Sequence, residues 1–171
     1  GDYDGAAEIL MRRNPIPAIT GRVCSHFCMQ ECGRGRYDKS VNIRHVERRM
    51  GDYILENAER LMPAPATETG KSVAVVGSGP AALSAAYYLR SAGNAVTIYE
   101  RMEEPGGALM YAIPEYRLPK DVVRKLIGAL EGMGIVFTCN TTIGEDITVR
   151  PGAKLIGTAK NPIIVKRGEV V

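Results

Sequence analysis

Residues 73–86 read Val73-Ala-Val-Val-Gly-Ser-Gly-Pro-Ala-Ala-Leu-Ser-Ala-Ala86, and this stretch decides the fold. An apolar run leads into a turn with glycine at Gly77 and Gly79, and the turn opens an alanine-rich run. A second apolar run starts at Ala95 and stops at Glu100, 23 residues after Gly77. The order strand, glycine turn, helix, strand and acid predicts a Rossmann-type βαβ unit that binds a dinucleotide.

Each part of this pattern has a role in dinucleotide binding. Gly77 permits the tight turn, and Gly79 lets the backbone approach a pyrophosphate. Amides at the helix N-terminus hold that anion, and Glu100 accepts hydrogen bonds from a ribose hydroxyl. Ala82 takes the third glycine position and still permits close packing of helix on strand. A plain structural turn is the alternative, but it does not account for the strands, helix and acid in register.

Length, composition and charge indicate which class of protein contains this unit. A chain of 171 residues suits one domain with an appendage. Hydrophobic residues make up 45% of it and charged residues 24%, as in ordinary globular proteins. The net charge of +3 is small and scattered, which argues against nucleic acid as a partner. No apolar run approaches about 18 residues and nothing resembles a signal peptide, so we expect a cytoplasmic protein without a membrane span.

Three of the four cysteines, Cys24, Cys28 and Cys32, lie close together, and Cys139 lies far from them. Clustered thiols in a chain without a secretory signal favour metal or redox chemistry over structural disulfides. On a helix, the i, i+4, i+8 spacing would bring the three side chains to one side. Spacing alone leaves an iron–sulfur cluster, a zinc ion and inert or redox-active thiols open, because the usual fourth cysteine is missing.

Shifts in composition divide the chain into four parts. Residues 1–62 are polar, rich in arginine and helical in periodicity, so they predict a small α-helical domain. Residues 63–71 read as an extended linker. Residues 72–149 carry strand and helix patterns in alternation, and residues 150–171 form a tail with no assignment. We therefore expect an α-helical domain followed by an α/β domain.

The expected elements follow from periodicity and turn residues. In the α/β domain, their order is that of an open parallel sheet. The N-terminal helices are expected at Asp4–Arg12, ending before Asn14-Pro-Ile-Pro17, and from Val41 to Ala58. The later elements are strands at 72–76, 95–100 and 135–139 and helices at 80–91 and 120–133.

Four motifs occur in order: the segment from Asn14 to Cys24, the three cysteines, the glycine turn, and the segment from Pro105 to Pro119. Together they closely resemble the small (beta) subunit of NADPH-dependent glutamate synthase. Relatives in this group are the N-terminal part of dihydropyrimidine dehydrogenase and the large subunit of NADH-dependent ferredoxin:NADP oxidoreductase. The resemblance covers roughly residues 10–149. It implies a helical iron–sulfur domain followed by a partial Rossmann-like FAD-binding domain of the glutathione-reductase type.

The resemblance also implies an activity. In this group, electrons pass from NAD(P)H to FAD and through [4Fe-4S] clusters to a partner, either a catalytic large subunit or another electron acceptor. Relatives carry further cysteines upstream and a pyridine-nucleotide domain downstream, so we interpret the chain as a truncated piece; a naturally split subunit that a partner chain completes is the alternative. We assign no catalytic residue. The alternative function is a non-catalytic assembly or interaction module with a degenerate nucleotide site.

Carried over position by position, the resemblance implies residues that bind FAD. It favours FAD over NAD(P)H because the segment from Pro105 to Pro119 matches the part of the group next to the flavin. Ala108 stands where leucine is usual, and a surface charge is the alternative interpretation of Arg117. The implied pyrophosphate turn is Gly77, Ser78, Gly79, Pro80 and Ala81; Glu100 would bind the ribose, Gly106, Gly107 and Ala108 would lie beside the flavin, and Arg117 and Ile143 would contact FAD, Ile143 at its adenine end.

The resemblance implies metal ligands as well. Cys24, Cys28 and Cys32 match ligands of a [4Fe-4S] cluster, although three thiolates are one short of the usual four. Glu47 falls where relatives have a Gln or Glu that completes one cluster. A solvated helix residue is the alternative interpretation of Glu47.

Overall fold

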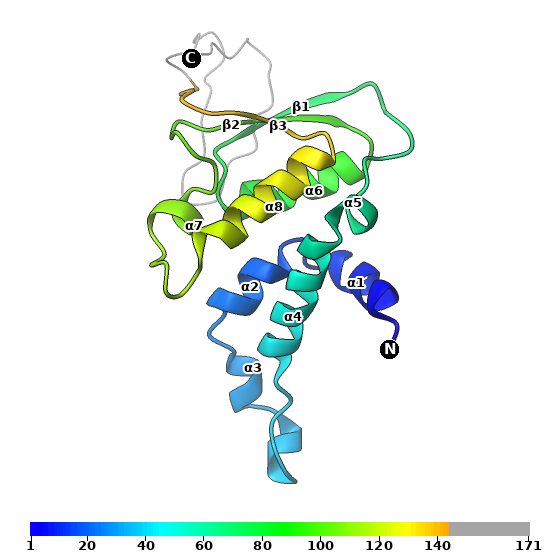
Figure 1. Ribbon diagram of the computed structural model, residues 1–171, viewed down its shortest axis with the longest axis vertical. Helices are drawn as coiled ribbons and strands as arrows, with labels where there is room; N and C mark the ends of the chain where they lie inside the picture. Colours follow the sequence, from blue (N-terminus) through cyan, green and yellow to red (C-terminus); the bar gives the residue numbers. More distant parts are fainter. Residues whose placement is uncertain (144–171) are drawn as a thin grey trace, which may run out of the picture.

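The computed structural model describes residues 1–143, in which a helical part precedes an α/β part (Figure 1). The end of the expected 72–149 domain and the expected tail at 150–171 lie outside the described residues. No helix within residues 1–143 is long and apolar enough to cross a membrane.

Six short helical elements form the first part. The two expected helices are confirmed, although the second starts at Ile43 and a break at Asn57 separates its last turn. A helix from Pro17 was not expected, because Pro15 and Pro17 were interpreted as the end of the preceding helix. Pro17 is instead the first residue of a new helix, where the missing N–H costs nothing. The elements are α1 (Tyr3–Met11), α2 (Pro17–Val23), α3 (Phe27–Gln30), the 3₁₀ turn η1 (Gly33–Arg36), α4 (Ile43–Glu56) and α5 (Ala58–Leu61).

Helices α2 and α4 cross at two glycines. A Cβ on Gly21 would lie 2.4 Å from the backbone nitrogen of Arg48, and a Cβ on Gly51 would lie 2.1 Å from that of Ala18. The two backbones therefore approach more closely than any side chain would allow. The crossing buries Ile19 and Ile54 almost completely.

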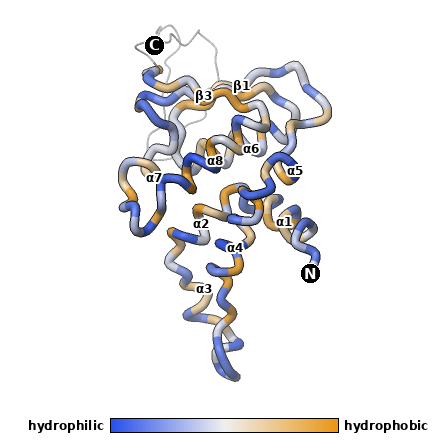
Figure 2. The backbone as a smooth tube through the Cα atoms, viewed as in Figure 1, coloured by the Kyte–Doolittle hydropathy of each residue, from blue (hydrophilic) through white to orange (hydrophobic). Residues whose placement is uncertain are grey.

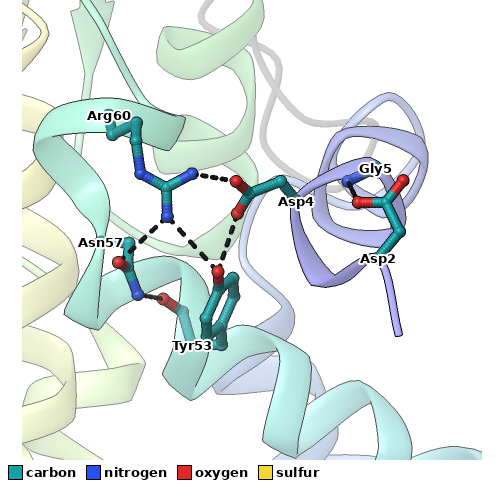
Figure 3. Close-up of polar contacts among 6 residues, drawn as sticks. All are labelled: Asp2, Asp4, Gly5, Tyr53, Asn57 and Arg60. Carbon is teal, nitrogen blue, oxygen red and sulfur yellow. Dashed lines mark hydrogen bonds and ion pairs between the residues drawn. The ribbon is translucent and has the colours of Figure 1, made fainter.

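Polar contacts hold α1 against α4 and α5 (Figure 3). The Asp4 carboxylate accepts a hydrogen bond from the Tyr53 hydroxyl at 2.8 Å and pairs with the Arg60 guanidinium. Arg60 also donates to the side-chain oxygen of Asn57 at 3.1 Å. These contacts connect α1 to the end of α4 and to α5.

The second part is a parallel three-stranded sheet in the order β1-β2-β3. Its register places Val73 opposite Val96 and Ile98 opposite Phe137. Helices α6 and α8 lie against the same face of the sheet (Figure 1). The expected parallel sheet is thus confirmed, with elements β1 (Ser72–Val76), α6 (Pro80–Ser91), β2 (Ala95–Tyr99), α7 (Ala108–Tyr111), α8 (Lys120–Gly132) and β3 (Val136–Thr138).

An apolar core lies between the sheet and these helices. Ile98, Leu83 and Leu130 are fully buried there. In Figure 2 the strands are largely hydrophobic, whereas the segment that joins α3 to α4 is mostly hydrophilic. These buried residues form one apolar cluster with those of α1, α2 and α4, and the rigid strand ends can position a site.

Candidate functional site

The glycine turn joins the end of β1 to the start of α6. Gly77 has φ +80°, a conformation that side chains with a Cβ rarely adopt. Gly79 is the N-cap of α6. No atom lies within 4 Å of where a Cβ would stand on either residue, so the space above the turn is open. The turn can therefore admit an anionic group to the first amides of the helix.

Glu100 follows β2 directly and is only 5% exposed. Its Oε2 accepts a hydrogen bond from the backbone N–H of Ser78 at 2.9 Å, and its Oε1 accepts one from the N–H of Met102 at 2.9 Å. The carboxylate is thus fixed against the glycine turn. A carboxylate has about four acceptor positions, so Glu100 keeps acceptor capacity for a ligand hydroxyl.

A pocket of about 520 Å³ opens over the turn and the acid. The ends of β1 and β2, the residues after Glu100 and the start of α7 form its walls. It brings together seven of the FAD residues implied by the sequence; Pro80, Ala81, Gly106 and Arg117 do not line it. Its lining is Val76, Gly77, Ser78, Gly79, Tyr99, Glu100, Arg101, Met102, Gly107, Ala108, Tyr111, Thr141, Thr142 and Ile143.

Several lining residues were missed by the sequence reasoning. Arg101 and Met102 follow β2, and Thr141 and Thr142 come soon after β3. The carboxyl ends of parallel strands meet at one edge of a sheet and form its ligand crevice. The expected parallel strands, with their carboxyl ends at one edge, would therefore have predicted these four residues as part of the site.

The segment after Pro105 closes one side of the pocket. Gly107 has φ +52°, and a Cβ there would lie 3.1 Å from the Cα of Gly79. Gly107 thus lets this loop touch the glycine turn. Arg117 is exposed and donates through Nη2 to the backbone oxygen of Val23, at the end of α2, at 3.4 Å. Its contact with FAD stays a prediction.

The cysteine segment is not one helix, so the interpretation that helical spacing aligns the thiols is wrong. Cys24 ends α2 with an extended ψ of 138°, and His26 is left-handed with φ +49°. A four-residue α3 follows, and Cys32 is again extended, with ψ 118°. These breaks turn the backbone between successive cysteines.

The three cysteines carry free thiols, with Cys24 and Cys28 exposed and Cys32 half-buried. The Sγ of Cys24 accepts a hydrogen bond from the N–H of His26 at 3.3 Å. Hydrogen bonds from backbone N–H groups, that of Val41 first and that of Arg34 second, lower the pKa of the Cys32 thiol. Hydrogen bonds of this kind stabilise the thiolate form, which is the form that binds metal.

The thiol donors suit an iron–sulfur cluster by their chemistry, but the described residues do not gather them. Within residues 1–143, no group of three His, Cys, Asp or Glu side chains is placed to hold a metal ion. Glu47 Oε1 accepts hydrogen bonds from Asn14 Nδ2 at 2.5 Å and from Thr20 Oγ1 at 3.1 Å. That oxygen is therefore committed to contacts within the protein, and the ligand set stays a prediction.

Comparison with protein-family models assigns both parts of the chain. Residues 1–59 match the family described as dihydropyrimidine dehydrogenase domain II, 4Fe-4S cluster. Residues 75–122 match the NAD(P)-binding Rossmann-like domain. An iron–sulfur domain followed by a Rossmann-like domain is the fold class expected from the sequence.

Curated proteins show the same relationship. The chain is 43% identical over 148 residues to the glutamate synthase [NADPH] small chain of Bacillus subtilis, covering 86% of this chain and 30% of that protein. It is 35% identical to the NADP(+)-dependent formate dehydrogenase subunit beta of Moorella thermoacetica over 87% of this chain and 24% of that protein. With the NAD-dependent dihydropyrimidine dehydrogenase subunit PreT of Escherichia coli K12, the identity is 35% over 86% of this chain and 36% of that protein.

The chain therefore spans between a quarter and just over a third of the length of these relatives. Their names are those of NAD(P)-dependent oxidoreductase subunits. The resemblance to the glutamate synthase small-chain group is confirmed.

Proposed function

We propose that the chain is the iron–sulfur and FAD-binding portion of an NAD(P)H-dependent electron-transfer oxidoreductase of the glutamate synthase small-chain type. The observation that carries the proposal is the pocket where the glycine turn meets Glu100, on the same chain as a match to a 4Fe-4S domain. In this role, electrons from NAD(P)H reach FAD and leave through iron–sulfur clusters to a larger partner subunit.

The domain division is part of the proposal. We assign residues 1–62 to the iron–sulfur domain, 63–71 to a linker and 72–149 to the FAD domain. The two family matches, at residues 1–59 and 75–122, fall inside the first and last of these ranges and support them. We also assign the protein to a reducing compartment such as the cytoplasm, in which clustered thiols stay available for metal binding.

FAD is the proposed occupant of the pocket. The glycine turn and the acid would serve FAD or NAD equally well, so they do not choose between them. The choice is supported by the segment from Pro105 to Pro119, which the resemblance places beside the flavin and whose Gly107 packs on the turn. We assign pyrophosphate binding to the turn and ribose binding to Glu100.

The test is to purify the chain gently and measure its flavin absorption spectrum together with its iron and sulfide content. Flavin bands near one equivalent per chain support the proposal. Protein that binds NADPH in titration but neither retains nor takes up FAD contradicts the FAD assignment. Protein that binds neither nucleotide nor iron favours the non-catalytic module instead.

The cluster ligands need a separate experiment, because three thiolates are one short of a usual set. We propose Cys24, Cys28, Cys32 and Glu47 as ligands. Anaerobic reconstitution and one-electron reduction with dithionite, followed by electron paramagnetic resonance, should give a weak, oxygen-labile [4Fe-4S] signal that Glu47→Ala removes. A stable, stoichiometric signal that survives Glu47→Ala would exclude Glu47 as the missing ligand.

A further inference from the structure

We propose that Ser78 is a positioning residue whose hydroxyl fixes the loop at Gly106 and Gly107 on the glycine turn, and thereby favours binding of the flavin half of FAD. The inference rests on the proposed function, because it concerns the same pocket. It differs from the role implied by the resemblance, in which Ser78 is only one residue of the pyrophosphate turn.

The burial of the Ser78 side chain is not explained by its position in the glycine turn. In the glycine pattern this position takes any residue, since only the backbone forms the turn. Yet Ser78 has no exposed surface at all. A polar group that is fully buried costs free energy unless its hydrogen bonds are made, so the partners of the hydroxyl show what it does.

The hydroxyl joins two segments that are far apart in the sequence. Ser78 Oγ donates a hydrogen bond to Glu100 Oε2 at 2.5 Å, and it accepts one from the backbone N–H of Gly106 at 2.8 Å. A serine hydroxyl has one donor and two acceptor positions, so it can serve both partners at once. Neither alanine nor glycine at this position could connect the acid to the loop.

The two partners differ in how much they depend on Ser78. Glu100 also accepts the backbone N–H groups of Ser78 and Met102, so it keeps two fixed contacts without the hydroxyl. The Gly106 N–H is buried and would lose the acceptor that holds it. Gly107 and its neighbour Ala108 line the pocket, so a displaced loop changes the wall that the resemblance places beside the flavin.

The experiment compares two ligands on the full 171-residue chain and on its variants Ser78→Ala and Ser84→Ala. ADP carries the adenosine and the pyrophosphate without the flavin. Ser84 lies on α6 and its Oγ donates to the backbone oxygen of Pro80 within the same helix, so it is the matched control. For Ser78→Ala, we expect the Kd of FAD to rise about tenfold and that of ADP by less than about threefold, with both unchanged for Ser84→Ala.

Equal weakening of FAD and ADP by Ser78→Ala would overturn the inference while leaving FAD binding intact. A wild-type chain that binds ADP but not FAD would instead overturn the proposed function. Amide exchange measured by NMR without ligand tests the role of Ser78 independently of the proposed function. The Gly106 amide should exchange about tenfold faster in Ser78→Ala than in the wild type, because one hydrogen bond is lost. An unchanged Gly106 exchange rate would contradict the positioning role, whatever the ligand data show.

Discussion

Between Arg22 and Arg49 no residue is buried, whereas α8 alone buries five apolar side chains. We call residues 22–49 the cysteine arm. In Figure 1 it extends away from the rest of the molecule, with α3 and the first half of α4 side by side. Folding has to offset the conformational entropy of every ordered residue, and burial is the main favourable term. The α/β unit is therefore held by buried side chains, which it shares in one apolar cluster with α1, α2 and α4, whereas the arm requires something outside its own side chains.

The surface of the arm is consistent with that requirement. It exposes large apolar side chains: Phe27 is 70% exposed, Tyr37 91% and Val46 59%. It also carries seven of the chain's 22 Lys and Arg residues against three of its 19 Asp and Glu residues. Positive charge near the three thiols favours the binding of an anionic cluster. A bound cluster is thus the factor we expect to order the arm.

The largest expected effect comes from the core of the α/β unit. Leu130→Ala removes a fully buried side chain of α8 and should lower the free energy of unfolding by about 2–5 kcal/mol. The matched change in the arm, Val46→Ala, should alter it by less than about 0.5 kcal/mol. Denaturant unfolding of both variants measures the difference, and equal losses would mean that the arm is packed as tightly as the core.

The next largest effect is expected at the crossing of α2 and α4, from which the cysteine arm extends. Gly51→Ala places a Cβ against the backbone of α2 and should destabilise the chain by about 1–3 kcal/mol. Gly128 lies on α8 with nothing within 4 Å of a Cβ, so Gly128→Ala should stabilise by up to about 1 kcal/mol. Thermal unfolding of the pair reports both signs. A neutral Gly51→Ala would show that the α2–α4 crossing adjusts.

The pocket should lose affinity without loss of the fold. Glu100→Gln keeps the shape of the buried side chain but removes its charge, which weakens hydrogen bonds to ribose hydroxyls. We expect the Kd of FAD to rise about tenfold or more. The chain should stay folded but lose about 1–3 kcal/mol of stability, because the new amide nitrogen cannot accept a backbone N–H that the carboxylate accepted. Flavin fluorescence quenching measures the affinity. Glu103→Gln, an exposed change nearby, is the control, and equal affinity of all three proteins would exclude the ribose role.

Cluster loading should act on the arm alone. Hydrogen exchange read by mass spectrometry should show fast exchange in residues 24–49 of the cluster-free chain and slower exchange after anaerobic reconstitution. Residues 95–135 should exchange slowly in both states, because their hydrogen bonds lie in a packed unit. Strong protection of the arm before reconstitution would contradict its dependence on the cluster.

The smallest effect concerns pH. Hydrogen bonds from Tyr53, first, and from Arg60 lower the pKa of Asp4. Its contribution to stability is therefore present above the pKa of an unfolded aspartate, about 3.9, and is lost as the pH falls through the lower folded value. Asp4→Asn should reduce the melting temperature slightly at pH 7 and not at pH 2. The control is Glu8→Gln, also on α1, and a loss of equal size at both pH values would exclude the ionised carboxylate as the cause.

The sequence by itself determined the βαβ unit, the position of the glycine turn and the acid at the end of β2. These features depend on local rules, since hydrophobic period and turn chemistry act over a few residues. The family resemblance rests on motifs of the same local kind. The helices at Asp4 and Val41 were found in this way too, with their boundaries displaced by one or two residues.

Tertiary structure alone decided which segments meet. The hydroxyl of Ser78 bonds Glu100 and Gly106, Gly51 contacts Ala18, and Arg117 reaches α2. No local pattern encodes these contacts, because each joins positions far apart in the chain whose distance is set by packing. The arrangement of the cysteines could not be predicted from their spacing either. That spacing suited one helix, but the backbone turns at Cys24 and His26, on an arm without a core. The three thiols therefore do not lie along one side of a helix.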